Sequence, residues 1–352
     1  MMLKNTFLNI ICLTCISFAI KAQIIEDYEE EVEGEHYIVF EDAINSRLYL
    51  SQKFTSFRIN DRLTGTDYMY MPNTTLNLGI GATYRWATLN LAYGFNFLNP
   101  DQGQGDTRYL DLQAHAYPRA MVVDLFGQFY KGYHMLPEGK AAPDGENFYY
   151  RPDLVVTKLG ASVQYVFNFE KFSFNAAFLQ NEWQRKSAGT PLLGFEMYGG
   201  RARGDSALIP IELIEDPERN FTRTRFFDLG PNLGYAYTLV FLKNFFVTAS
   251  ASTNLVIGHA IQDGDHYRER DWDVRPNLFF RIFAGYNSER WSLNGNFVYN
   301  NVRFASTENF TNSMMTGNYR VNFIYRFIPG GRLKERLQPI RGIDDELSPN
   351  NN

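Results

Sequence analysis

A small group of side chains suited to acid–base chemistry lies in the first half of the chain. Asp111, Gln113 and His115 occupy every second position of one segment, and Asp124 follows a turn near Pro118. If that turn centres on Pro118, Asp124 lies across from Gln113 and diagonal to Asp111 and His115. A carboxylate beside an imidazole can activate a hydroxyl nucleophile in a hydrolase. However, no Ser or Thr accompanies His115 on the same face, so catalysis is not the reading that the pattern favours.

The segments that carry these residues read as β-strands, because apolar and polar residues alternate along them. From Thr75 to Trp86 every second residue is apolar and mostly bulky, and the segment 87–98 repeats the pattern. Aromatic residues make up 16% of the chain, with 30 Phe and 22 Tyr, and yet the mean hydropathy is −0.32. An apolar outer face combined with a polar lumen gives this composition in outer-membrane barrels.

We therefore predict an all-β fold, a transmembrane up-and-down antiparallel β-barrel of about twelve strands. The predicted strands are 47–59, 74–85, 87–98, 107–117, 120–131, 154–167, 171–181, 225–241, 245–260, 274–286, 291–300 and 313–327. Short connections alternate with long ones at 60–73, 99–106, 132–153, 182–224, 261–273 and 301–312. This alternation predicts short periplasmic turns and long extracellular loops. Aromatic residues at strand ends predict interfacial belts, namely Tyr84, Trp86, Phe97, Phe172, Phe245, Tyr286, Trp291, Tyr325 and Phe327.

In this frame the polar residues of the first paragraph face the lumen of the barrel. The same inward face carries further charged residues, and acids and bases inside a barrel are expected to pair because unmatched buried charge is costly. We predict a lumen charge network of Asp111, His115, Asp124, Lys158, Asp228, Arg275, Arg281, Arg320 and Arg326, with Gln113, Gln128 and Gln164 on the same face. A pore-lining charge ladder is the alternative reading.

The two ends of the chain differ from the barrel in composition. Residues 1–22, with Lys4 before an apolar run, are typical of a cleaved export signal, and a lipidated Cys15 is the alternative. Both cysteines lie in this signal, so the mature chain is expected to lack thiols. Residues 23–46 contain nine acids and no Lys or Arg, which predicts an acidic periplasmic arm. The barrel is expected over 47–328 and a periplasmic tail over 329–352.

No cofactor or metal site is expected from the sequence. The histidines are scattered without ligand spacing, and the Asp263, Asp265, Asp271 and Asp273 cluster reads as a solvated loop, with a cation site as the alternative. Outside the acidic arm the chain is near neutral, so nucleic acid is not an expected partner. The expected partners are outer-membrane lipid and lipopolysaccharide, the barrel insertion machinery, and a periplasmic protein bound through the acidic arm.

Three stretches resemble an uncharacterised Bacteroidota family, catalogued as domain of unknown function 4421. They are Met71–Arg85, Tyr109–Gln113 and Asp124–Tyr133, and the likeness covers roughly 45–328. The resemblance implies an outer-membrane barrel of a Gram-negative bacterium and assigns no binding or catalytic residue.

Three functions remain open from the sequence. The first is a narrow or gated channel, or a structural envelope protein, since a barrel of this size leaves a lumen that side chains nearly fill. The second is an envelope assembly or secretion component that docks periplasmic proteins. The third is a barrel-embedded hydrolase around His115 and Asp124. We do not expect the protein to be an enzyme.

Overall fold

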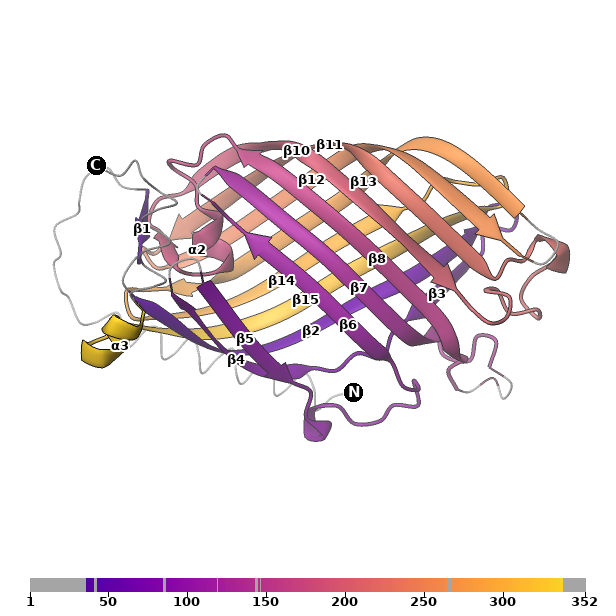
Figure 1. Ribbon diagram of the computed structural model, residues 1–352, viewed down its shortest axis with the longest axis horizontal. Helices are drawn as coiled ribbons and strands as arrows, with labels where there is room; N and C mark the ends of the chain where they lie inside the picture. The colour runs from indigo at the N-terminus through magenta and orange to yellow at the C-terminus, as the bar shows by residue number, and fades with distance from the viewer. Residues whose placement is uncertain are drawn as a thin grey trace. The chain divides into compact units, whose positions relative to one another are not determined.

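Hydrogen bonds between antiparallel strands close the chain into a barrel (Figure 1). The structure, a computed structural model, describes residues 36–337 apart from 41–42, 85–86, 119, 143–144, 146 and 265–267. The predicted signal, most of the acidic arm and most of the C-terminal tail therefore lie outside the described residues.

The strands pair in an order that returns to its start. Within the described chain the ring runs β2–β3–β7–β8–β10–β11–β12–β13–β14–β15, and β15 pairs with β2, so ten strands close the barrel. β4 and β5 extend the sheet from β2, and β6 extends it from β7. The bounds are β2 Ile44–Asp61, β3 Asp67–Met71, β4 Asn77–Tyr84, β5 Ala87–Tyr93, β6 Arg108–Ala116, β7 Met121–Leu136, β8 Tyr150–Val166, β10 Ala188–Arg203, β11 Arg223–Phe241, β12 Phe245–Asp263, β13 Arg268–Asn287, β14 Trp291–Arg303 and β15 Phe310–Phe327.

Elements outside the large sheet are short. β1 Tyr37–Val39 pairs with β9 Glu182–Gln184, α2 spans Phe174–Phe178, and α3 spans Gly331–Arg336. Single 3₁₀ turns occur at Asn96–Leu98 and Pro217–Arg219. The first strand of the barrel, β2, begins at Ile44, slightly before the predicted start at residue 47.

The predicted fold class is confirmed, although one predicted strand is absent and two strands of the ring were not predicted. Segment 171–181 contains no strand: Phe174 and Phe178 belong to α2, and Phe172 precedes it. The N-terminus of α2 is capped by the Ser173 hydroxyl, which accepts from the Ala176 amide (2.9 Å). One of the two strands that were not predicted is β10, which lay inside the predicted loop 182–224. Its four glycines and Pro191 weaken the β signal. The predicted loop 60–73 likewise contains β3.

Side chains alternate between the two faces of the wall as predicted. The outward positions are apolar and exposed, as at Leu233 (62%) and Ile257 (58%), whereas their inward neighbours Asn232 and Val256 are buried. An exposed apolar surface of this extent marks a lipid-facing wall. At the end with the short connections, rings of Phe245, Tyr286 and Trp291 contact one another outside the barrel. Phe172, predicted for this belt, is instead buried inside, and Trp86 lies outside the described residues.

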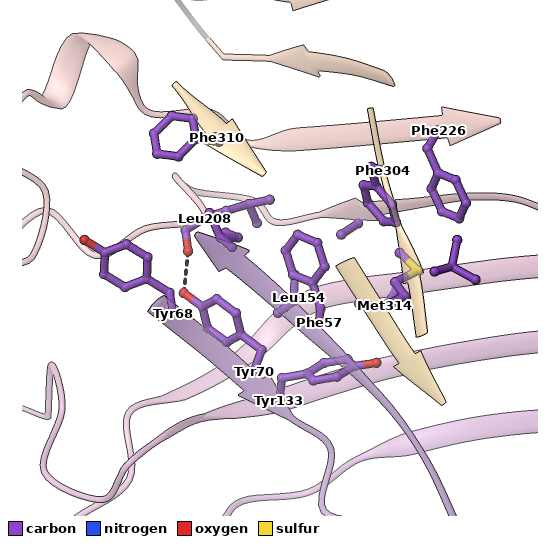
Figure 2. Close-up of a cluster of buried hydrophobic side chains, with 14 of the residues drawn as sticks. Phe57, Tyr68, Tyr70, Tyr133, Leu154, Leu208, Phe226, Phe304, Phe310 and Met314 are labelled. Atoms are coloured by element: carbon purple, nitrogen blue, oxygen red, sulfur yellow. Dashed lines mark hydrogen bonds between the residues drawn. The ribbon is translucent and has the colours of Figure 1, made fainter. Parts of the chain in front are cut away.

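The two ends of the barrel differ. The turn end carries the short connections 85–86, 117–120, 242–244 and 288–290, and the loop end carries 62–66, 94–107, 137–149, 204–222 and 304–309. At the loop end the interior is packed with apolar side chains, which include Phe57 and Tyr70 from the strands and Phe304 from the connection 304–309. The 204–222 loop folds inward and adds Leu208 and Phe221 to this loop-end core. Figure 2 shows part of it, with the Tyr70 hydroxyl donating to the Leu208 carbonyl oxygen.

The turn end is closed by the chain itself. The segment 167–187, which we call the plug, contains α2 and β9 and lies inside this end of the barrel. Its Phe178 ring packs against His115 of β6 and Phe283 of β13, at 5.0 and 5.4 Å between ring centroids. Arg326 of β15 donates to the Gln180 carbonyl oxygen at 2.7 Å. Because β1 pairs with β9, residues Tyr37–Val39 of the predicted arm join the plug directly.

The wall has one unpaired boundary among the described residues. β5 and β6 follow each other in the chain, yet no hydrogen-bonded pairing joins them, and β3 bridges β2 to β7 only at the loop end. We call this boundary the β5–β6 seam. Thr88 and Asn90, which face inward on β5, are exposed, whereas inward residues of fully paired strands, such as Ser252, are buried. The wall therefore opens beside β5 in the turn half of the barrel.

The seam predicts unequal reactivity at two inward positions. In a background with Cys12 and Cys15 replaced, Asn90→Cys should react with iodoacetamide at least about ten-fold faster than Ser252→Cys, because thiol reactivity follows access. The rates are measured on the folded protein in detergent. Equal protection of both positions would mean that β5 and β6 close the wall.

Candidate functional site

The predicted acid and imidazole meet in the interior of the barrel. Asp124 lies directly opposite His115 in the β6–β7 register, and His115 Nδ1 and Asp124 Oδ1 are 2.6 Å apart. The predicted register placed Asp124 opposite Gln113, which instead faces Phe126. The difference arises because the connection 117–120 is centred beyond Pro118, so that Ala116 pairs with Val123. A strand pair tolerates such a two-residue shift without changing faces.

Asp124 also binds a cation from the opposite wall. The Arg281 guanidinium of β13 donates to Asp124 Oδ2, and both side chains are buried. The Arg281 guanidinium stacks on the Phe279 ring, 3.8 Å from its centroid. His115, Asp124 and Arg281 therefore form a triad, with Asp124 and Arg281 buried and His115 partly buried, that ties β6, β7 and β13 together across the lumen.

The surroundings of His115 are aromatic. Its ring lies 6.4, 6.1 and 5.0 Å from the rings of Tyr117, Phe126 and Phe178. Ser162 faces inward opposite Asp124 on β8. In the part of the chain that the structure describes, no hydroxyl group is hydrogen-bonded to His115, and so the geometry presents an oriented imidazole without an activated nucleophile.

Three further predicted charges have acidic or basic partners. Arg275 of β13 binds Asp228 of β11 at 2.5 Å and also donates to the Arg303 carbonyl oxygen. Asp111 accepts from the Tyr130 hydroxyl at 2.7 Å and lies 3.6 Å from Lys53. Lys53 was not among the predicted residues, although its inward position on β2 follows from the same alternation.

Three of the predicted cations lack a carboxylate partner among the described residues. Lys158 donates to Asn300 at 2.5 Å and to Thr316 at 3.1 Å. Arg320 stacks over the Tyr49 ring at 4.4 Å. Arg326 binds carbonyl oxygens of the plug and of the turn at 288. Among the described residues, the partners of Arg326 and Arg320 are thus backbone carbonyls and an aromatic ring, and their expected pairing with acids stays a prediction.

Sequence reasoning also missed two interior groups. Glu196 accepts from Asn232 at 2.8 Å and from Asn254, and it was missed because β10 was not recognised as a strand. Arg47 of β2 donates to Thr83 of β4 at 2.6 Å and to the Leu179 carbonyl oxygen of the plug at 3.2 Å. Its inward position could have been read from the alternation of β2.

The described residues contain no group of three or more potential metal ligands. In the aspartate cluster, Asp263 pairs with Arg225 and Arg268, while Asp271 and Asp273 lie on β13 and Asp265 falls outside the described residues. No described helix is long and apolar enough to cross a membrane.

The fold and the lipid-facing wall define a transmembrane β-barrel protein. Residues 35–327 match the family described as a domain of unknown function, DUF4421, and the chain belongs to that family. No curated protein matches the chain.

Several solved barrels are similar in fold. The toluene transporter TodX of P. putida is 8% identical, covering 82% of this chain and 91% of its own, with a TM-score of 0.25. The translocator domain of the autotransporter NalP from Neisseria meningitidis is 8% identical, covering 92% and 98%, with a TM-score of 0.32. OmpT of Vibrio cholerae is 9% identical, covering 85% and 100%, with a TM-score of 0.26.

The buried pair of Asp124 and Arg281 in this triad predicts a large loss of stability when only the acid is removed. Asp124→Asn should lower the free energy of unfolding by about 3–5 kcal/mol, because Arg281 then lacks a charged partner in the interior. Unfolding in urea from lipid vesicles measures this loss, and the exposed Glu289→Gln serves as the control. The double variant Asp124→Leu with Arg281→Met should recover much of the loss. A small effect of Asp124→Asn would mean that the triad is solvated.

Proposed function

We propose that this protein is an outer-membrane barrel with its turn end in the periplasm. The support is the exposed apolar wall, the aromatic contacts outside the turn end, and the short connections gathered at that end. The plug and the attached arm would then face the periplasm, and the 204–222 loop would face outward.

We further propose that the barrel is a gated conduit that opens sideways into the membrane. One observation carries this proposal: the loop-end core fills the axial path, whereas the inward face of β5 is exposed at the β5–β6 seam. A straight pore from end to end is disfavoured by that core, since packed apolar side chains exclude water and ions. A route from the bilayer through the seam to the turn end crosses only the polar middle and the plug.

The charge beside the seam indicates the class of substrate. The turn half of the lumen holds Arg47, Arg320 and Arg326, and among the described residues none of them is paired with a carboxylate. Buried cations without acids are costly unless an anion binds near them. A molecule that enters from a bilayer is apolar for most of its length. An amphipathic molecule with an anionic head group therefore fits both features.

The plug is placed to act as the gate. Arg326 holds it through the Gln180 carbonyl oxygen, and Arg47 holds it through the Leu179 carbonyl oxygen. Arg47 also bonds Thr83, whose hydroxyl lies 2.9 Å from that of Thr88 on β5. This series of hydrogen bonds connects the plug to the strand at the seam, so displacement of one is expected to affect the other.

Weakening the plug should increase transport of an anionic amphiphile. In a Gram-negative host, Arg326→Ala should raise the initial uptake of nitrobenzoxadiazole-labelled dodecanoate several-fold over the wild type, because the plug loses its strongest anchor. The labelled alcohol without the carboxylate should show a smaller increase. Arg336→Ala, at an exposed position of α3, serves as the control.

Planar-bilayer recordings complete this test. Because the loop-end core remains in place, Arg326→Ala should give no ohmic ion current. A steady current would instead indicate an axial channel, and unchanged dodecanoate uptake would indicate a structural barrel. Either result contradicts the proposed conduit.

A further inference from the structure

A groove lies on the outer surface of the barrel, away from the seam and the lumen. It follows the neighbouring strands β7, β8, β10 and β11 (Figure 1) and has a volume of about 740 Å³. Its floor is formed where Gly199 lies between Leu159 of β8 and Phe227 of β11 in the register. Ala161 continues the floor towards the turn end, and Met197 borders it. The floor is apolar and narrow.

Two arginines stand at the loop-end margin of this groove. Arg201 and Arg225 are direct cross-strand partners on β10 and β11, and both point outward and are exposed. Like charges directly opposite each other on a sheet destabilise it. Asp263 binds Arg225 at 2.8 Å but is shared with Arg268, and among the described residues Arg201 has no hydrogen-bonded or ionic partner. The pair therefore carries excess positive charge.

The position of the groove and the chemistry of its lining together indicate the class of ligand. Two adjacent guanidinium groups match the oxygens of a phosphate group, which accepts charge-assisted hydrogen bonds from both. The apolar floor continues from the arginines along a wall that faces hydrocarbon. An acyl chain is the group that fills such a groove without leaving polar atoms unsatisfied.

We propose that this groove binds one phosphorylated, acylated lipid of the outer leaflet, with its phosphate on Arg201 and Arg225 and an acyl chain over Gly199. This site depends on the membrane placement proposed above but not on transport through the barrel. It therefore assigns a lipid-binding role to the outer wall that is separate from the lumen.

The chain supplies a matched control for this site. Arg203 and Arg223 form the next outward cross-strand pair of arginines, two residues nearer the loop end and outside the groove. The groove can also be filled without altering any charge. A Cβ at Gly199 would have only ordinary contacts, at 3.6 Å to the Phe226 carbonyl oxygen and 3.7 Å to the Phe227 ring, so Gly199→Leu is compatible with the fold.

Native mass spectrometry of the purified full chain in a neutral detergent tests the proposal, with lipid A as the probe. The wild type should bind one lipid A, and both Arg201→Gln/Arg225→Gln and Gly199→Leu should weaken binding at least about ten-fold. Arg203→Gln/Arg223→Gln should weaken it less than about two-fold. Dephosphorylated lipid A should bind at least about ten-fold more weakly than lipid A.

Three results would overturn the site. Equal losses for the two arginine pairs would indicate non-specific attraction to a basic rim. Full binding by Gly199→Leu would show that no acyl chain occupies the groove. Displacement of lipid A by an equimolar amount of inorganic phosphate would show a simple anion site. Heat-modifiable gel migration confirms that each variant is folded, and neither the seam nor the plug enters the measurement.

Discussion

The structure depends on the hydrogen bonds between neighbouring strands. In hydrocarbon an unpaired backbone N–H or C=O group costs several kcal/mol, so a membrane-spanning sheet pairs its edges, and the β5–β6 seam is the exception in this wall. In this barrel β15 pairs with β2, from Phe310 opposite Asp61 to Phe327 opposite Ile44. Once the ring is closed, the two-residue period of each strand decides which side chains face lipid and which face the interior.

Closure also explains how the interior is divided. Inward side chains of ten strands converge on a narrow space, and different parts of the chain fill the two ends of the barrel. The loop end receives apolar residues from the strands and from 204–222, while the turn end receives the plug. Between them the inward residues are polar and meet across the lumen, as in the contact of Arg281 with Asp124. The charged side chains lie between the two packed ends. Because they are buried there, they must pair with one another, with amide groups or with carbonyl oxygens.

Much of the wall could be predicted from the sequence, because one-sided alternation is a local property. The inward positions of Asp124, Lys158 and Arg281 follow directly from it. The register between strands was harder to predict. Asp124 lies opposite His115 because of where the 117–120 turn is centred. β10 was missed because its glycines conceal the pattern, and Glu196 was missed with it.

Features that depend on distant parts of the chain could not be predicted. Phe172 and Phe174 alternate as in a strand, and only burial inside the barrel identifies their segment as a plug. The carbonyl partners of Arg326 come from the plug and from a turn, which no spacing in the sequence indicates. The seam likewise results from how β3 bridges β2 and β7 while leaving β5 and β6 apart.

The central claim is that the wall is continuous except beside β5. Hydrogen–deuterium exchange of the full chain in lipid nanodiscs measures this directly, because exchange reports the opening of individual backbone hydrogen bonds. The account predicts rapid exchange at the unpaired edges of β5 and β6, and exchange slower by orders of magnitude along β11 and β12. Equal protection of all four strands would contradict it.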